Sequence, residues 1–589
     1  MSDSEGSFEV IGDSPWWNYA VRLRHFLLSE WRQLGCCLVV GLVLATMPNW
    51  MTLIRSGSSV YLADEDEVEC YAPALAQAFE RHPWTLGDPA LAEGGESLYP
   101  RLQMVPAVLL AKALGLEPID ILFLWRIFSG LSLSLVLYLL ARDFLGNPNW
   151  AMVLTVLLLS DQGMVEGQPL RLHIQTGWHL FSGNDEVEAA SVTRILRHFR
   201  LITPGVNWVY LGACVLAMNR LLRVHSNGRF WLASASFGLL FYVYFYYWVA
   251  VAAALGLAVL MDFRRWRVYA GVLLAGGALG VPALIANVLT KATAAEGWLD
   301  RLQLFSHGHT GLGFVWPKVV AVLLLVCAGF VWRRHRDLLF IWCLVAVAMA
   351  LSVHERFTGI IMQNWHYSFI WGPLLCLLSY GIMARELQRS RLASKFTLVA
   401  GVGLAAFLFL TGLTYRGWEV VRNRPVLELA DEWKRYRSDQ TLRQALSPQR
   451  GVLAGDRSAI KFAVFDRAQR PLAGGLVYSH SISNRQWDER RMLDLFVSGV
   501  PVERAVSLAD GYPGGFWAAA SRDEAANRAK HAEFALIYQK IASDPFPWLV
   551  KYGVTQLVLP LGQAPPANLQ PKLRLVANGK FWDLWGRRE

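Results

Sequence analysis

The chain has 589 residues, of which 54% are hydrophobic and only 17% are charged, and it contains 25 tryptophans. Soluble domains carry about 25% charged residues, so this composition excludes an ordinary soluble protein. The formal net charge of +10 could indicate nucleic acid binding. The arginines, however, are grouped in short clusters between apolar segments, which is typical of cytoplasmic loops in membrane proteins. We therefore expect no nucleic acid partner.

The hydrophobic residues divide the chain into unequal parts. Apolar segments dominate residues 34–415, whereas residues 416–589 have the mixed composition of a soluble domain. We interpret 1–33 as a cytoplasmic segment, 34–415 as a transmembrane domain and 416–589 as a soluble α/β domain. A long loop, 55–118, follows the first span. No cleavable signal precedes that span, so it is expected to remain as an anchor.

Eleven apolar segments are candidate spans, because a helix crosses the hydrocarbon core with about 20 residues. They are Leu34–Ile54, Ile119–Ala141, Trp150–Asp161, Val206–Asn219, Phe230–Tyr247, Trp248–Met261, Val268–Leu289, Trp316–Trp332, Leu338–Val353, Phe369–Ala384 and Phe396–Tyr415. Basic clusters at alternate ends of these segments place the N-terminus in the cytoplasm and the C-terminal domain outside. Trp150–Asp161 is short for a span, and Leu102–Gly115 could cross in its place without changing this orientation.

An acidic motif follows the first span, with five carboxylates between Asp64 and Glu69. Apolar residues at helical spacing come after it, which places the motif at the start of a helix, where negative charge is favourable. Two interpretations remain open. The motif is either a plain acidic helix cap or a source of a catalytic carboxylate at the membrane surface.

Two further polar clusters lie on the same predicted outer side. One is basic and contains Arg197 and Arg200, which suits a bound phosphate or, alternatively, side chains that reach the membrane interface. The other combines His354 and Arg356 with His366. The two histidines lack the fixed short spacing of a zinc site. Polar clusters of opposite charge beside an apolar bundle suit a substrate with a lipid tail and a phosphate.

Several motifs together resemble the GT-C class of membrane glycosyltransferases. The acidic motif precedes Tyr71-Ala72, the segment Leu98–Gln103 leads into an amphipathic stretch, and Trp125-Arg126 opens a span that ends at Ala141–Gly146. Shorter motifs, Thr358-Gly359 with Trp365-His366 and Lys551–Val554, are similar to those of bacterial members with mostly unassigned activities. The resemblance covers residues 34–415 loosely. It implies eleven spans, with Leu102–Gly115 lying on the membrane.

The resemblance implies an inverting hexosyl or pentosyl transfer from a polyprenyl-phosphate sugar to a lipid, glycan or protein acceptor outside the bacterial inner membrane. One carboxylate would act as general base on the acceptor hydroxyl. Asp66 is the first candidate, with Asp64 and Glu67 as alternatives, and Glu67 stands where Asp is usual. The expected substrate-binding residues are Arg126, Arg197, Arg200, His354, Arg356 and His366. No cofactor is implied with certainty, and a divalent metal remains open.

The C-terminal domain shows strand-like segments at Gly451–Gly455, Leu476–Ser479, Gln556–Pro560 and Leu573–Trp585, and helices at Arg490–Val497 and Ala532–Ile541. It carries no phosphate loop, nucleophile elbow or zinc spacing. Two other functions compete with a transferase: a transporter or flippase of a lipid-linked saccharide, and a non-catalytic assembly protein of the cell envelope. The sequence has no obvious internal repeat and its charges avoid the span centres, which favours the enzyme.

Overall fold

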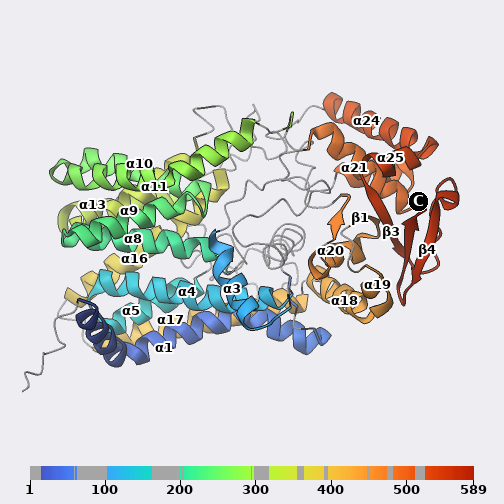
Figure 1. The fold of residues 1–589 in the computed structure, drawn as a ribbon. Helices are drawn as coiled ribbons and strands as arrows, with labels where there is room; N and C mark the ends of the chain where they lie inside the picture. The colour runs from blue at the N-terminus through green and yellow to red at the C-terminus, as the bar shows by residue number, and fades with distance from the viewer. Residues whose placement is uncertain are drawn as a thin grey trace, which may run out of the picture.

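A computed structural model gives the fold of the chain (Figure 1). It describes residues 15–58, 60–62, 102–117, 119–161, 196, 199, 205–292, 295–297, 318–354, 358, 364–389, 395–422, 424–446, 451–467, 469–473, 482–510 and 524–588. Long helices occupy one side of the molecule, and a small sheet with its own helices occupies the other. We call the end of the long helices next to the sheet the sheet-side end and the opposite end the far end.

A helix coincides with each of the eleven apolar segments expected from the sequence. These helices are α1 (Pro15–Ser56), α4 (Asp120–Leu145), α5 (Pro148–Ser160), α8 (Asn207–Arg223), α9 (Asn227–Leu240), α10 (Phe245–Met261), α11 (Trp266–Ala292), α13 (Lys318–Arg334), α14 (Leu339–Leu351), α16 (Ser368–Arg389) and α17 (Lys395–Arg422). Short 3-10 turns are η2 (Leu102–Met104), η6 (Phe263–Arg265), η7 (Arg336–Leu338) and η8 (Asn364–Tyr367). The turn between α9 and α10 lies at Phe241–Tyr244, earlier than the expected break after Tyr247.

Five of the described helices are long and apolar enough to cross a membrane by length and composition. They are Leu28–Ser56, Asp120–Leu145, Phe263–Leu289, Ser368–Arg389 and Phe396–Trp418. Shorter apolar helices include Leu102–Ala113, Pro148–Ser160 and Phe245–Met261. The helical region therefore has the composition of a multi-pass membrane protein, and the number of spans stays a prediction.

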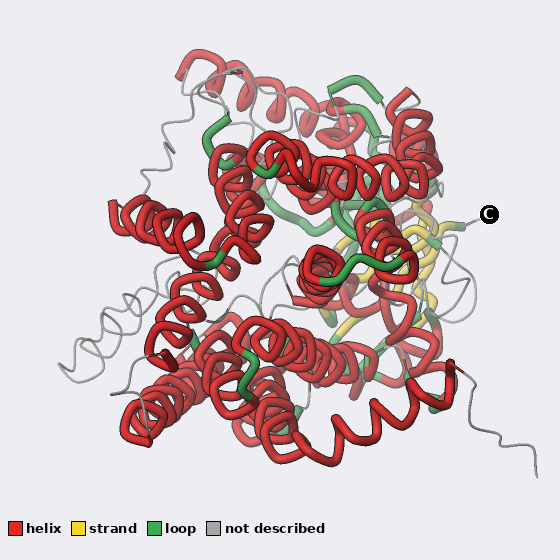
Figure 2. Tube along the Cα trace, turned by 90° about the vertical axis from the view of Figure 1, so that its left-hand side faces the viewer, coloured by secondary structure: helices red, strands yellow, loops and turns green. Residues whose placement is uncertain are grey.

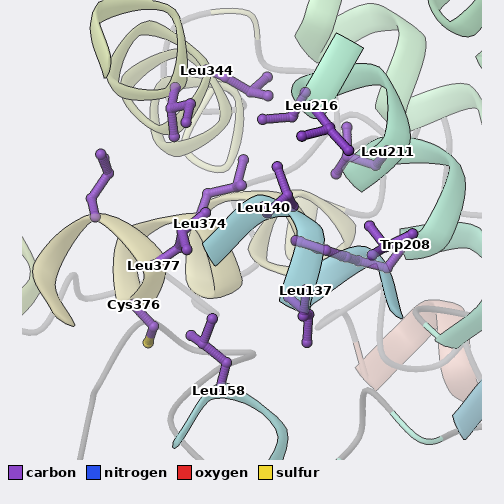
Figure 3. Close-up of a cluster of buried hydrophobic side chains, with 14 of the residues drawn as sticks. Leu137, Leu140, Leu158, Trp208, Leu211, Leu216, Leu344, Leu374, Cys376 and Leu377 are labelled. Atoms are coloured by element: carbon purple, nitrogen blue, oxygen red, sulfur yellow. The ribbon is translucent and has the colours of Figure 1, made fainter. Parts of the chain in front are cut away.

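Leucine and aromatic side chains fill the centre of the helical region, as Figure 3 shows for α4, α5, α8, α14 and α16. Two glycines allow a close crossing of α1 and α4. A Cβ atom added at Gly41 would lie 2.7 Å from the Gly130 carbonyl oxygen, and one at Gly130 would lie 2.7 Å from the Gly41 oxygen. The two backbones touch here, as they do where small residues line a helix interface in membranes.

Helix α5 ends partway through the bundle. Its 13 residues span only about 20 Å, and its C-cap residue Asp161 accepts a hydrogen bond of 2.5 Å from the Tyr380 hydroxyl. Tyr380 lies near the middle of α16. Asp161 is fully buried, so this carboxylate sits among apolar helices and not at their ends.

Ion pairs join the helices at the far end, where the sequence predicts the cytoplasm. Arg385 donates to Asp337 at 2.9 Å, and Arg223 donates to the same carboxylate at 3.3 Å. Arg142 donates to Glu30 at 2.8 Å. The arginine clusters that predict orientation thus also hold α1, α4, α8 and α16 together at this end.

The C-terminal sheet has five strands in the order β2-β1-β3-β5-β4. The strands are β1 (Val452–Gly455), β2 (Arg470–Pro471), β3 (Val554–Pro560), β4 (Leu573–Asn578) and β5 (Trp582–Arg587). Strand β1 is parallel to β2 and β3, whereas β5 is antiparallel to β3 and β4. Its helices are α18 (Arg424–Ser438), α19 (Gln440–Ala445), α20 (Arg457–Asp466), α21 (Asn484–Val497), α22 (Val502–Asp510), α24 (Glu524–Ser543) and α25 (Phe546–Lys551). An α/β arrangement was expected, and the two-residue strand β2 was not. The expected strand Leu476–Ser479 lies outside the described residues.

One hydrophobic cluster joins the two parts of the molecule. Met104 and Val108, on η2 and α3 (Val105–Ala113), pack in the same cluster as Trp125 of α4, Phe462 of α20 and Leu584 of β5. The amphipathic segment 102–115 therefore lies between the long helices and the C-terminal domain. Figure 2, viewed from the far end, shows the strands behind the helices.

Candidate functional site at the sheet-side end

The structure describes three of the nine residues expected to act in catalysis or substrate binding. Arg126, His354 and His366 are described. The other six, Asp64, Asp66, Glu67, Arg197, Arg200 and Arg356, lie outside the described residues, and their roles stay predictions.

Arg126 lies in the second turn of α4, and its guanidinium carbon is 4.5 Å from the centre of the Tyr61 ring. Both side chains are buried, with 2% of Arg126 and 1% of Tyr61 exposed. A cation over an aromatic face is attracted by the electrons of the ring, and this contact is stronger away from water. The Tyr61 ring therefore helps to hold a buried positive charge at the sheet-side end, just before the acidic motif.

Five aromatic side chains form a second group, which we call the aromatic cluster. It consists of Tyr244, Tyr246, His354, His366 and Tyr367. The His366 and Tyr246 rings are stacked, with their centroids 4.6 Å apart and an interplanar angle of 8°. The Tyr367 ring packs edge-to-face against Tyr246, with centroids 5.2 Å apart, and against His354, with centroids 6.4 Å apart. The Tyr244 hydroxyl forms a short hydrogen bond with Nδ1 of His366. The sequence placed His354 and His366 in one polar cluster, and the structure brings both side chains into this group.

Hydrogen bonds fix the orientation of His354. Its Nδ1 atom lies 2.7 Å from the Leu351 carbonyl oxygen. A carbonyl oxygen only accepts hydrogen bonds, so Nδ1 carries the proton and Nε2 carries the lone pair of the neutral ring. The Nε2 atom is buried and has no hydrogen-bond partner among the residues that the structure describes.

A backbone contact connects these two groups. The Leu102 amide donates to the Tyr242 carbonyl oxygen at 3.4 Å. Tyr242 lies in the turn just before the aromatic cluster, and Leu102 opens the segment that packs on α4 beside Arg126. Arg126 and the aromatic cluster therefore belong to the same end of the helical region.

Two buried charged residues inside the bundle were missed by the sequence interpretation. Asp161 is bound by Tyr380, and Arg416 of α17 donates from Nε to the Leu44 carbonyl oxygen at 3.0 Å. Arg416 is only 3% exposed. The sequence places Asp161 at the end of a span and Arg416 just beyond one, and only the short length of Trp150–Asp161 could have indicated a carboxylate at this depth.

The C-terminal domain also buries charged side chains, on helix α21. Asp488 accepts a hydrogen bond of 2.6 Å from Lys530, and Glu489 accepts one of 2.5 Å from Lys551. Asp494 accepts the Gly455 amide at 3.0 Å. Burial raises the pKa of Asp494 to about 6, although the Gly455 hydrogen bond opposes this shift. These groups have partners within the fold, so we interpret α21 as structural.

The described residues contain no group of three or more metal-ligand side chains. His354 and His366 are linked only through tyrosine rings in the contacts given above. A metal requirement stays open.

Comparisons with known proteins give structural likeness at low sequence identity. The chain is similar to the archaeal oligosaccharyltransferase AglB from Archaeoglobus fulgidus in complex with an inhibitory peptide and a dolichol-phosphate, with 11% identity and a TM-score of 0.43, covering 91% of this chain and 70% of that chain. It is also similar to the arabinofuranosyltransferase AftD from Mycobacteria, with 13% identity and a TM-score of 0.46, covering 95% of this chain and 40% of that chain.

The apo form of the Archaeoglobus fulgidus oligosaccharyltransferase gives 12% identity and a TM-score of 0.44, covering 91% of this chain and 70% of that chain. No protein-family model and no curated protein matches the chain. Likeness of this size does not assign a family or an activity. The function is therefore argued from the residues.

Proposed function

We propose that the protein is a membrane glycosyltransferase that moves a sugar from a polyprenyl-phosphate donor to an acceptor outside the cytoplasm. The observation that carries this proposal is the buried Arg126 stacked on Tyr61 at the sheet-side end of an apolar helical bundle. A buried cation at the end of such a bundle suits the phosphate of a lipid whose tail stays in the bilayer.

Chain connectivity limits how far the acidic motif can lie from Arg126. Tyr61 contacts Arg126, and Asp64 follows it by three residues, so the chain keeps Asp64 within about 11 Å of Tyr61. The same limit is about 18 Å for Asp66 and about 22 Å for Glu67. A carboxylate and a cation within reach of one substrate are the two groups that the transfer needs.

Each group has a definite task in the proposed reaction. One carboxylate removes the proton from the acceptor hydroxyl as that oxygen attacks the anomeric carbon of the donor. The bond between that carbon and the phosphate oxygen breaks, and the lipid phosphate leaves with the electron pair. Arg126 stabilises the negative charge that develops on the phosphate. Arg197, Arg200 and Arg356 are further phosphate candidates from the sequence.

The orientation and location belong to the same proposal. The far end, with its arginine clusters, faces the cytoplasm of a bacterial cell, and the C-terminal domain lies outside. The acceptor is a lipid, glycan or protein on that outer side. The C-terminal domain contacts α3 beside the Arg126 helix, which suits a role in acceptor binding.

A transfer assay tests this function. Full-length protein in proteoliposomes is given a panel of radiolabelled polyprenyl-phosphate sugars and membrane acceptors. The isosteric changes Asp64→Asn, Asp66→Asn and Glu67→Gln are compared with Glu117→Gln, an exposed carboxylate at the same end. We expect one of the three to abolish transfer and the control to keep it. Equal activity in all variants contradicts a carboxylate base in this motif.

A transporter of a lipid-linked saccharide is the second candidate, because Asp161 and Arg416 are buried within the helical region. Ionisable groups inside a membrane often mark a transport path. Translocation of a fluorescent lipid-linked saccharide across proteoliposomes separates the two functions. Flipping that is lost in Asp161→Asn, in protein that transfers no sugar, would support the transporter.

A further inference from the structure

The imidazole ring of His354 has one nitrogen whose hydrogen-bonding capacity is unused. Nδ1 donates to Leu351, and the buried Nε2 has no hydrogen-bond partner among the described residues. Leaving a buried polar atom without a partner costs about 1–3 kcal/mol. Unused atoms of this kind are uncommon in native proteins and often belong to binding sites.

The tautomer of His354 decides which ligand group could use Nε2. Nδ1 carries the proton that is donated to Leu351, so Nε2 of the neutral tautomer is an acceptor. It needs an O–H or N–H donor. The phosphate diester of a polyprenyl-phosphate sugar presents only acceptor oxygens to it, whereas the hydroxyls of the donor sugar and of the acceptor can donate.

The surroundings of His354 favour a hydroxyl-bearing ligand. Its ring packs edge-to-face on Tyr367, which contacts Tyr246, and Tyr246 stacks on His366. Aromatic faces pack against the C–H groups of apolar and amphipathic ligands, while the polar tips of tyrosine and histidine bind hydroxyls. The aromatic cluster thus surrounds an unused acceptor with buried aromatic rings.

We infer that Nε2 of His354 accepts a hydrogen bond from a sugar hydroxyl, of the donor or of the acceptor, so that His354 positions a sugar and not the phosphate of the donor. This inference rests on the proposed function for the identity of the two substrates. Arg126 binds the phosphate, and His354 binds the hydroxyl.

Two substitutions separate the anchoring role of His354 from its acceptor role. In His354→Asn, the amide nitrogen can replace Nδ1 as donor to Leu351, but no atom replaces Nε2. In His354→Gln, the longer side chain can place its oxygen near the Nε2 position, but the donor to Leu351 is lost. We expect His354→Asn to raise the KM of the substrate whose hydroxyl it binds, donor or acceptor, about ten-fold, as for one lost hydrogen bond, and to leave the KM of the other substrate unchanged. His354→Gln should recover part of that loss. An unchanged KM for both substrates would contradict the inference.

A binding experiment reads out His354 without sugar transfer. Full-length protein with isotope-labelled histidine, in lipid nanodiscs, is titrated with methyl glycosides of a hexose and a pentose and, separately, with citronellyl phosphate. We expect a glycoside to shift the Nε2 resonance of His354, identified by its loss in His354→Asn. A shift with citronellyl phosphate alone, or no shift with any probe, overturns the inference. Failure of the transfer assay with a glycoside-induced shift would reject the proposed function and leave His354 as a hydroxyl-binding residue.

Discussion

The Tyr380 hydroxyl donates a hydrogen bond of 2.5 Å to the buried carboxylate of Asp161, midway along α16. Hydrogen bonds to charged groups contribute about 1.5–3 kcal/mol. We expect Tyr380→Phe to destabilise the folded protein by about 2 kcal/mol, seen as a lower Tm in detergent.

Tyr247→Phe is the matched control for that change. The Tyr247 hydroxyl is also buried, but it has no hydrogen-bond partner among the described residues. Its removal should leave Tm unchanged or raise it slightly. Equal losses in both variants would contradict a specific role for the bond to Asp161.

The contact between α1 and α4 leaves no room for a side chain at Gly41. A methyl group there would lie 1.8 Å from Ser134 Oγ as well as 2.7 Å from the Gly130 oxygen. Gly41→Ala should therefore cost about 1–3 kcal/mol through displacement of the two helices. Gly35→Ala in the same helix meets no atom within 4 Å. It should keep Tm or raise it, and a loss as large as that of Gly41→Ala would count against the close crossing.

The contribution of Arg126 to sugar transfer should depend on its planar guanidinium as well as on its charge. Lysine keeps the charge but loses the fork that binds two phosphate oxygens and the flat face that lies over Tyr61. We expect Arg126→Lys to lower sugar transfer about 10-fold or more. Arg55→Lys changes an exposed residue in the last turn of α1. It should leave sugar transfer unchanged. Full activity in Arg126→Lys would remove this residue from the phosphate site.

Lys530 neutralises a carboxylate that is almost completely buried. Asp488 is 1% exposed, and Lys530 is its partner at 2.6 Å. Breaking a buried ion pair is strongly unfavourable, so Lys530→Met should destabilise the protein by about 3 kcal/mol. Lys540→Met changes an exposed lysine on the same helix. Thermal unfolding in detergent compares the two, and similar Tm values would show that Asp488 does not depend on Lys530.

Asp494 should make stability depend on pH in weakly acidic solution. Burial raises its pKa from 3.8 to about 6, against the lowering effects of the Gly455 amide, Arg491 and Arg457. A raised pKa in the folded state stabilises the fold below the unfolded pKa, and this contribution is lost as the pH rises through about 6. Asp494→Asn keeps an acceptor for Gly455 and cannot ionise.

The difference in Tm between Asp494→Asn and the unchanged chain should therefore change between about pH 4 and pH 6. The variant gains relative stability as the pH rises, by an amount on the order of 2–3 kcal/mol at neutral pH. Asp544→Asn, a change at an exposed position in the same domain, provides the control. A constant difference across this range would mean that Asp494 titrates normally.

The sequence predicts the positions of the apolar helices well, because runs of hydrophobic residues reflect burial in a core or a membrane without reference to distant contacts. It misplaces the turn between α9 and α10. The segment Phe241–Tyr244 contains no glycine or proline, so only the packing of its aromatic rings shows where the helix ends. Helix α21 begins earlier than expected, at Asn484, and the capping box of Ser483 and Gln486 is a sequence signal for that start.

The candidate site is predictable only in part. The sequence selects His354 and His366 as members of a polar cluster in a predicted outer loop, and the resemblance to the GT-C class implies Arg126. It could not show that Arg126 lies over Tyr61 or that the tautomer of His354 is fixed by Leu351, because these contacts join the side chains to atoms whose positions depend on the fold. Asp161 was missed because a predicted span is assumed to end at the membrane surface, and α5 does not.

The cluster that joins α3 and α4 to the C-terminal domain has a consequence for biosynthesis. Met104, Val108 and Trp125 leave the ribosome well before Phe462 and Leu584, which help to bury them. An apolar patch on the Arg126 side of the nascent protein stays uncovered until β5 has been translated. A premature stop codon before β5 would therefore leave a membrane protein that is inserted but has an exposed apolar patch. Quality-control proteases are expected to degrade it.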